Sequence, residues 1–133
     1  MNNLINNINS EEDVAKLETF SQLSPQILTA LNFLAKEPLE QLLFASSESY
    51  VTPFAIIAVS SSPKQIDAMT THYIKLLKEK NLFNMTIRVD GNGEREWCTI
   101  DLSNCFLHVI TKQKLAKYEL EKILKGDYSA NSF

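Results

Sequence analysis

The sequence predicts an α/β (α+β) domain in which a mixed sheet is flanked by helices. An unbroken apolar run covers residues 54–59, between Pro53 and a serine cluster, which is typical of a strand buried on both faces. A capping box with proline at the first helical position follows at once, over residues 62–65. A buried strand that leads directly into a helix is typical of α/β proteins.

The other elements follow from turn residues and periodicity. A helix is expected from the Ser24-Pro25 pair, with its apolar residues on one face, and Pro38 ends it. The helix that begins in the capping box keeps helical spacing to about Lys80. Strands are expected over 39–46, 54–59, 85–89, 97–102 and 105–110, a turn over 90–93, and a last helix from Thr111 to Gly126.

Three segments divide the chain. Residues 1–23 form a polar N-terminal extension with one weak helix signal, and this segment could equally be a tether that orders only on a partner. Residues 24–126 form the folded domain, and residues 127–133 form a C-terminal tail.

Composition limits the classes of partner. The formal net charge is −3, and residues 1–24 carry all of it, so the remaining 109 residues balance to zero. A protein that binds by neutralising phosphates would carry an excess of Lys and Arg on its folded part. We therefore expect little direct RNA contact.

No apolar run approaches the roughly 20 residues that span a bilayer, so no membrane partner is expected. The two cysteines favour a reducing compartment over a disulfide framework.

The last two strands form a hairpin with two different faces. If Ser103-Asn104 is a two-residue turn, one face is wholly apolar and belongs in the core. The other face places three pairs opposite one another: Asp101 with Phe106, Thr99 with His108, and Trp97 with Ile110. Two explanations fit this mixed face. The C-terminal helix could cover it, with Asp101 and His108 paired beneath, or the face could be a docking surface, since aromatic residues among a few polar groups are typical of interface centres.

The sequence contains no catalytic or metal-binding constellation. Cys98 and Cys105 point to one face of the hairpin and His108 to the other, so the three cannot share a tetrahedral zinc ion. Ser60 and Ser62 precede a helix and could hold a phosphate, but no glycine-rich loop accompanies them. We expect no enzyme activity, no cofactor and no metal.

Several segments, in this order, resemble the ribosomal silencing factor (Iojap) family over about residues 25–125. They are Phe54-Ala55-Ile56-Ile57-Ala58, Ser60–Gln65 with Ala68, Glu96-Trp97-Cys98-Thr99-Ile100-Asp101, Phe106-Leu107-His108-Val109 and Tyr118-Glu119-Leu120-Glu121. The chain departs from the family pattern at Pro53, Ser60, Leu115 and Leu124.

The resemblance implies a mixed five-stranded sheet with flanking helices, similar to the nucleotidyltransferase fold without its catalytic carboxylates. It implies a factor that binds the large ribosomal subunit through the conserved large-subunit ribosomal protein fourteen. Such a factor would sterically block subunit joining, in large-subunit assembly or translational silencing. The expected partner-binding residues, at the contact or supporting it, are Trp97, Thr99, Asp101, Phe106, His108, Ile110 and Tyr118.

The sequences at Ala68-Met69 and Tyr118–Lys122 resemble those of the mitochondrial branch of the family. It favours the mitochondrial matrix over the bacterial cytoplasm, and it implies a LYR-motif protein and an acyl carrier protein as further partners. Two other hypotheses stay open. One is a degenerate nucleotide-binding, nucleotidyltransferase-like protein that uses Ser60 and Ser62. The other is a plain dimerisation module that uses the hairpin face around Trp97.

Overall fold

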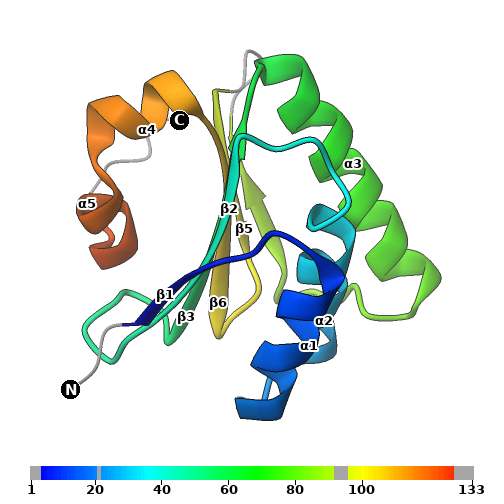
Figure 1. Ribbon diagram of the computed structural model, residues 1–133. Coiled ribbons are helices and arrows are strands. Elements are labelled where there is room, and N and C mark those ends of the chain that lie inside the picture. The colour runs from blue at the N-terminus through cyan, green and yellow to red at the C-terminus, as the bar shows by residue number, and fades with distance from the viewer. Residues whose placement is uncertain (1–3, 21, 92–95, 128–133) are drawn as a thin grey trace.

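The computed structural model describes residues 4–20, 22–91 and 96–127, and it has a sheet between two layers of helices (Figure 1). The elements in chain order are β1 (Leu4–Asn7), α1 (Glu11–Phe20), α2 (Pro25–Leu34), β2 (Gln41–Ser46), β3 (Phe54–Ser60), α3 (Pro63–Glu79), β4 (Arg88–Asp90), β5 (Trp97–Asp101), β6 (Cys105–Thr111), α4 (Lys112–Tyr118) and α5 (Leu120–Lys125). The mixed α+β fold with flanking helices is therefore confirmed.

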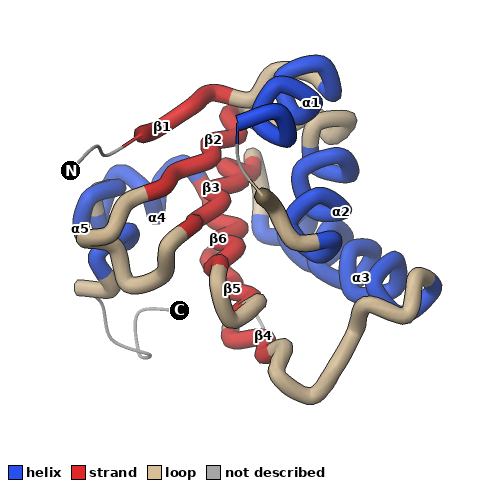
Figure 2. The backbone as a smooth tube through the Cα atoms, turned by 90° about the horizontal axis from the view of Figure 1, so that it is seen from below, coloured by secondary structure: helices blue, strands red, loops and turns tan. Residues whose placement is uncertain are grey.

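The sheet has six strands among the described residues, in the order β1-β2-β3-β6-β5-β4, where five were expected. The additional strand is β1, which pairs antiparallel with β2. The pairing of β3 with β6 is parallel, and the pairings of β2 with β3, β5 with β6 and β4 with β5 are antiparallel. Figure 2 shows the strands side by side, with β1 and β4 at the two ends.

Each face of the sheet packs against its own hydrophobic core. The larger core lies beneath α1, α2 and α3, and it includes Ile27, Leu31, Ile66 and Leu77. The smaller core lies beneath α4 and α5. Because β3 lies in the middle of the sheet and is covered on both sides, six of its seven residues are buried. This agrees with the apolar run that predicted it.

Local capping explains where α2 and α3 begin. The Ser24 side chain accepts a hydrogen bond from the Ile27 N–H at the start of α2. The Ser62 side chain likewise accepts from the Gln65 N–H at the start of α3, at 3.2 Å. Both helices have proline in their first turn, as predicted.

Two elements differ from the predicted ones. The strand expected over 85–89 is shorter and begins at Arg88, because Met85 and Thr86 form a turn in which the Asn84 side chain accepts a hydrogen bond from the Thr86 N–H. The single helix expected after Thr111 is divided at Glu119, whose φ of 59° is outside the helical region. Residues 92 and 93 of the turn predicted over 90–93, and residues 128–133 of the predicted tail, lie outside the described residues.

The segment expected to be a polar extension contributes to the sheet and to the larger core. Ile8 and Val14 are buried there, and the Ile8 N–H donates to the Leu42 carbonyl at 2.8 Å. Lys36 of the α2–β2 connection forms an ion pair with Glu11 of α1, with 3.1 Å between the Lys36 Nζ and Glu11 Oε1 atoms. Residues 4–20 are thus a packed arm along one end of the fold.

Candidate protein-docking site

The β5–β6 hairpin has the register that its two-residue turn predicted. Asp101 lies opposite Phe106, Thr99 opposite His108, and Trp97 opposite Ile110. The Leu102 N–H donates to the Cys105 carbonyl at 2.8 Å, and Ser103 adopts a φ of 77° to make the tight turn.

One face of this hairpin is entirely apolar and belongs to the larger core, as predicted. Its residues are Cys98, Ile100, Leu102, Cys105, Leu107 and Val109. Both cysteines are free and buried on this side, while His108 lies on the other side of the sheet. Burial raises the pKa of the Cys105 thiol, so this cysteine stays protonated. The two cysteines act as small core residues.

Helices α4 and α5 lie over the mixed face. Trp97, His108 and Ile110 have no exposed surface, and Thr99 is buried as well. The small core beneath the two helices combines Trp97 and Ile110 with Ile123 and Leu124 from α5. The explanation in which C-terminal helices cover this face is therefore the observed one for these four hairpin residues.

His108 bonds to its neighbours on β5 within the same face. The Trp97 Nε1–H donates to His108 Nδ1 at 3.1 Å, and the Thr99 hydroxyl lies 3.0 Å from the same nitrogen. The expected pairing of Asp101 with His108 is wrong. The Asp101 carboxylate instead accepts from the Ser103 N–H at 2.8 Å, because it lies at the turn, two residues beyond Thr99 on the strand.

Asp101, Phe106 and Tyr118 are only partly buried, and the two aromatic residues end a row of rings. Phe106 meets the His108 ring edge to face at 5.9 Å between centroids. The Trp97 ring lies 5.9 Å from His108 and 5.5 Å from Tyr118. The row has a buried, hydrogen-bonded middle and two accessible ends, so the buried rings hold the accessible ones in place.

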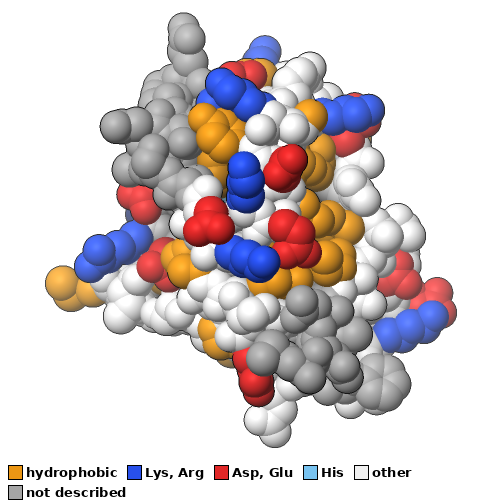
Figure 3. All heavy atoms as spheres, turned by 90° about the vertical axis from the view of Figure 1, so that its left-hand side faces the viewer, with side chains coloured by type: hydrophobic (Ala, Val, Ile, Leu, Met, Phe, Trp, Pro, Cys, Tyr) orange, Lys and Arg blue, Asp and Glu red, His pale blue; other side chains and the backbone are white. Residues whose placement is uncertain are grey.

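Lysines surround the Tyr118 end of this row. The Lys114 and Lys117 ammonium groups lie 5.2 and 5.5 Å from the centre of the Tyr118 ring, within the range of cation–π attraction. Figure 3 shows this side of the molecule, on which hydrophobic side chains reach the surface between charges of both signs. Figure 2 shows that β5 and β4 extend beyond the part of the sheet beside α4 and α5.

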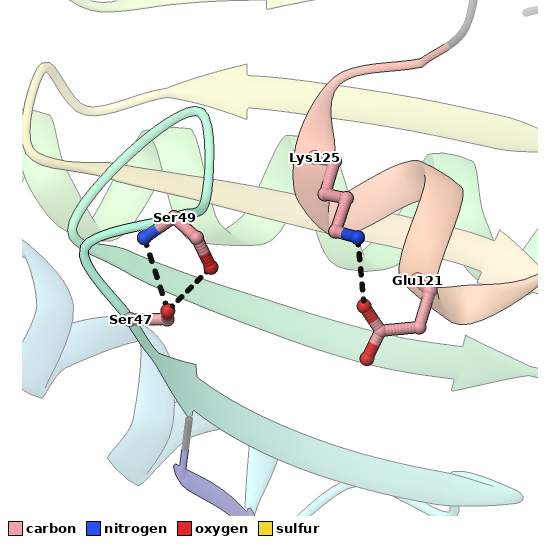
Figure 4. Close-up of polar contacts among 4 residues, drawn as sticks. All are labelled: Ser47, Ser49, Glu121 and Lys125. Carbon is pink, nitrogen blue, oxygen red and sulfur yellow. Dashed lines mark hydrogen bonds and ion pairs between the residues drawn. The ribbon is translucent and has the colours of Figure 1, made fainter. Parts of the chain in front are cut away.

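The loop between β2 and β3 holds α5 in place, and the sequence reasoning did not assign it this role. The Val51 N–H donates to the Leu124 carbonyl at 3.1 Å, and the Tyr50 side chain is buried in the small core. Burial, and then the charge of Glu121, raise the pKa of Tyr50. Within the loop the Ser47 and Ser49 hydroxyls lie 2.8 Å apart, close to the exposed Glu121–Lys125 pair of α5 (Figure 4).

The only signal for this contact in the sequence is the aromatic and β-branched pair Tyr50-Val51 after a polar turn cluster. That pair reads as the beginning of a strand, and nothing local indicates that it meets α5.

The serines before α3 are bound within the chain. Ser60 Oγ lies 2.8 Å from both the Ser62 carbonyl and Gln65 Oε1, and the Ser61 N–H donates to the same amide oxygen at 3.0 Å. The Gln65 side chain therefore takes the N–H and hydroxyl donors that a phosphate would need at this helix start. Ser62 is the cap of α3.

The described residues contain neither a cluster of metal ligands nor a membrane-spanning helix. No group of three or more His, Cys, Asp and Glu side chains among residues 4–20, 22–91 and 96–127 could hold a metal ion. In the same ranges, no helix has the length and apolar character needed to cross a membrane.

Sequence comparison places these features in a family. A model of the family described as "Ribosomal silencing factor during starvation" matches residues 22–131, most of the chain. The chain is 28% identical over 96 residues to ribosomal silencing factor RsfS of Halalkalibacterium halodurans, covering 71% of this chain and 80% of the relative. It is 26% identical over 76 residues to RsfS of Haemophilus influenzae, covering 57% of this chain and 72% of that one.

A solved crystal structure also matches this fold. A crystal structure of a protein from Bacillus halodurans superposes with a TM-score of 0.59 and 28% sequence identity, over 73% of this chain and 90% of the other. Both named relatives are silencing factors. The matched residues include the buried strand β3, the β5–β6 hairpin and both C-terminal helices. The chain therefore belongs to the ribosomal silencing factor family.

Proposed function

We propose that this protein binds the large ribosomal subunit through the conserved large-subunit ribosomal protein fourteen and thereby sterically blocks subunit joining. The observation that carries the proposal is the row of rings that runs from the hairpin to α4, with accessible ends at Phe106 and Tyr118, in a member of the silencing family. A factor of this kind acts during large-subunit assembly or to silence translation.

Rigid aromatic side chains are good anchors for a protein partner. A partner gains most from side chains that lose little conformational freedom on binding, and both accessible rings are already held by buried neighbours. Asp101, beside Phe106, adds a charged group to the edge of the anchor. Trp97, Thr99, His108 and Ile110 support the contact from beneath, and Asp101, Phe106 and Tyr118 make it.

The charge distribution supports a protein as the main contact. The 109 residues after the first 24 are neutral overall, and both signs are interspersed on the face that carries α4 and α5 (Figure 3). Binding that is dominated by phosphates would need an excess of cations. We therefore expect the affinity for the large subunit to fall only weakly with salt.

The proposed mechanism requires only that the factor be bound to the large subunit. A bound factor fills space that the small subunit would occupy, so no group has to be activated and no cofactor is required. The proposal is limited to protein fourteen: a LYR-motif protein and an acyl carrier protein remain expectations for the mitochondrial branch, and the two relatives named above are bacterial.

Co-sedimentation tests the proposal directly. The purified protein is mixed with isolated large subunits from its own source and centrifuged through sucrose. It should travel with large subunits, and adding it before the small subunits should reduce joined ribosomes measured by light scattering. Recovery only in the ribosome-free fraction would contradict the binding, and unimpaired joining at saturation would contradict the steric mechanism.

A matched pair of variants locates the contact. Phe106→Lys should weaken binding to the large subunit and to isolated protein fourteen at least tenfold, because it removes an anchor ring. Phe83→Lys changes another accessible phenylalanine, which lies between α3 and β4, and should bind like the wild type. Equal effects of the two substitutions would place the contact elsewhere.

A further inference from the structure

The chain leaves the carboxyl ends of β3 and β6 in two directions. These two strands are neighbours and run parallel. The helix that follows β3 is α3, over the larger core, and the helix that follows β6 is α4, over the smaller core. Figure 1 shows α3 and α4 on opposite sides of the sheet. In open α/β sheets, ligands bind outside the carboxyl ends of the strands at such a point of divergence.

A cleft of about 320 Å³, here named the α4 cleft, lies between α4 and this end of the sheet. Val59 of β3 is buried and contributes one apolar wall, and Leu115 and Ala116 of α4 contribute another. The volume is near the lower limit for small-ligand sites and equals that of about ten water molecules in the liquid. The α4 cleft therefore suits a ligand of roughly ten non-hydrogen atoms.

The rim of the α4 cleft carries one acidic and one basic side chain. Glu40 directly precedes β2, and its backbone N–H donates to the Val59 carbonyl at 2.9 Å, which fixes its place at the end of the sheet. Lys112 is the first residue of α4. Both residues are exposed, and neither forms an ion pair with another described residue. An anion on the sheet side and a cation on the helix side are thus open to a ligand.

These charges select among ligands of that size. A fatty acid or a phosphate compound would meet Lys112, but it would also meet the like charge of Glu40. An amine without an acidic group would meet the reverse. A zwitterion forms charge-assisted hydrogen bonds with both side chains. A free amino acid with an aliphatic side chain adds an apolar group for the walls, and its size of about nine non-hydrogen atoms fits the volume.

We infer that the α4 cleft binds a free amino acid with an aliphatic side chain. The ligand carboxylate lies on Lys112, the ligand ammonium group on Glu40, and the ligand side chain against Val59, Leu115 and Ala116. Binding of the amino acid goes beyond the proposed ribosome contact and does not depend on it.

Helix α4 connects this cleft to the proposed docking surface. Lys112 and Leu115 at the cleft and Tyr118 at the docking surface belong to one helix, of which no residue is buried. A ligand that joins the sheet to α4 favours one position of the helix, and with it one position of Tyr118. The family silences ribosomes during starvation, when free amino acids are scarce. The bound amino acid should therefore weaken binding to the large subunit, a coupling that rests on the proposed function.

Isothermal titration calorimetry of the full chain with L-leucine tests the site. A dissociation constant on the order of 100 μM is expected for so small a ligand in an open cleft. Isocaproate is leucine without its ammonium group, isopentylamine is leucine without its carboxylate, and glycine lacks the apolar side chain. Each should bind at least tenfold more weakly than L-leucine, and ligand-detected NMR measures these weaker affinities.

Two variants assign the two charges. Lys112→Gln should weaken L-leucine binding at least tenfold and leave isopentylamine binding unchanged, because that ligand has no carboxylate. Glu40→Gln should weaken L-leucine binding equally and leave isocaproate binding unchanged. Lys75→Gln on α3 and Glu48→Gln in the β2–β3 loop remove the same charges at other exposed positions and should bind L-leucine like the wild type. A variant that keeps the affinity for one analogue is folded, so loss of the fold cannot imitate the expected pattern.

The results separate the site from its coupling. Absence of L-leucine binding at about 10 mM overturns the site. Isocaproate or isopentylamine that binds as tightly as L-leucine also overturns it, as does wild-type affinity for L-leucine in both Lys112→Gln and Glu40→Gln.

Co-sedimentation with large subunits in about 5 mM L-leucine tests the coupling. Binding to the subunit that is at least threefold weaker than without L-leucine supports it, and unchanged binding overturns it. A protein that binds L-leucine but no large subunit would contradict the proposed function and the coupling, while the calorimetry would still establish the amino-acid site.

Discussion

His108 is a buried histidine whose Nδ1 atom is hydrogen-bonded within the sheet. Its Nδ1 atom accepts from the indole of Trp97, which fixes the tautomer with the proton on Nε2. Burial lowers the pKa of His108 to about 3, because the charged ring would lose its hydration. The side chain is therefore neutral at physiological pH, and its role is to hold the indole and, through it, Tyr118 in place.

This lowered pKa predicts a dependence of stability on pH. The unfolded chain binds a proton at His108 below about pH 6.5, whereas the folded chain does not until about pH 3. The contribution of neutral His108 to stability is thus complete above pH 6.5 and is lost as the pH falls from 6.5 towards 3. Within this range, protonation of His108 in the unfolded chain should lower the free energy of unfolding by up to about 1.4 kcal/mol for each unit by which the pH falls.

Urea denaturation at several pH values between 7.5 and 4.5 measures this dependence. Carboxylates titrate over part of the range, so His108→Gln is the reference: its amide oxygen can accept from Trp97 and does not titrate. The wild type should lose stability more steeply than the variant as the pH falls. Parallel curves for the two proteins would contradict neutral burial of His108.

At the residue scale, the sequence predicted which hairpin residues lie opposite one another better than it predicted their hydrogen-bond partners. The alternation of side chains placed Thr99 opposite His108 and Asp101 opposite Phe106 correctly. It did not predict the bond from Trp97 to His108, because these residues are diagonal neighbours on the two strands and the bond depends on side-chain rotation. The pairing of Asp101 with His108 belonged to one of the two explanations of this face, and the turn uses that carboxylate instead.

Elements far apart in the chain meet where the β2–β3 loop contacts α5. Gly126 ends α5 with a φ of 77°, and a Cβ atom built there would lie 3.2 Å from the Val51 Cβ and Cγ2 atoms. The position therefore favours glycine for two reasons, the left-handed backbone and the close approach of the loop. The same loop donates the Val51 N–H bond to Leu124.

Gly126→Ala should lower the free energy of unfolding by about 1–2 kcal/mol, through backbone strain and the contact with Val51. Thermal and urea denaturation measure the change. The double variant G126A/V51G removes both Val51 atoms that make the contact and keeps the strain at residue 126, so a double-mutant cycle with Val51→Gly separates the two causes. A Gly126→Ala protein as stable as the wild type would show that α5 ends differently in solution.

Element boundaries were predicted where a local signal exists and missed where the cause is distant. The capping box fixed the start of α3, and the apolar run fixed β3 almost to the residue. The division between α4 and α5 was missed because apolar spacing continues through Glu119. The chain bends there so that Ile123 and Leu124 reach the small core, a requirement that comes from the sheet and not from the helix.

The whole molecule depends on an arm that lies outside the region matched by the family model. That match begins at residue 22, whereas residues 4–20 supply β1 and α1. The arm was not predicted as a strand because Leu4-Ile5-Asn6-Asn7 has two asparagines, which are depleted in strands. β1 is specified instead by its pairing with the edge of β2, a contact between segments about 40 residues apart in sequence.

A packed arm predicts that a substitution within it destabilises the entire fold. Val14 of α1 is 1% exposed and lies in the larger core, so Val14→Ser should lower the free energy of unfolding by about 2–3 kcal/mol, through lost apolar contacts and a buried hydroxyl. Lys16→Ser changes an exposed position on the same helix and should alter it by less than about 0.5 kcal/mol. Urea denaturation followed by circular dichroism and by Trp97 fluorescence measures both, and the two signals should shift together, because the arm and the distant indole belong to one cooperative unit. Equal stability of Val14→Ser and Lys16→Ser would mean that residues 4–20 are a separate tether. Loss of helical signal before any change at Trp97 would mean that the arm unfolds independently of the sheet.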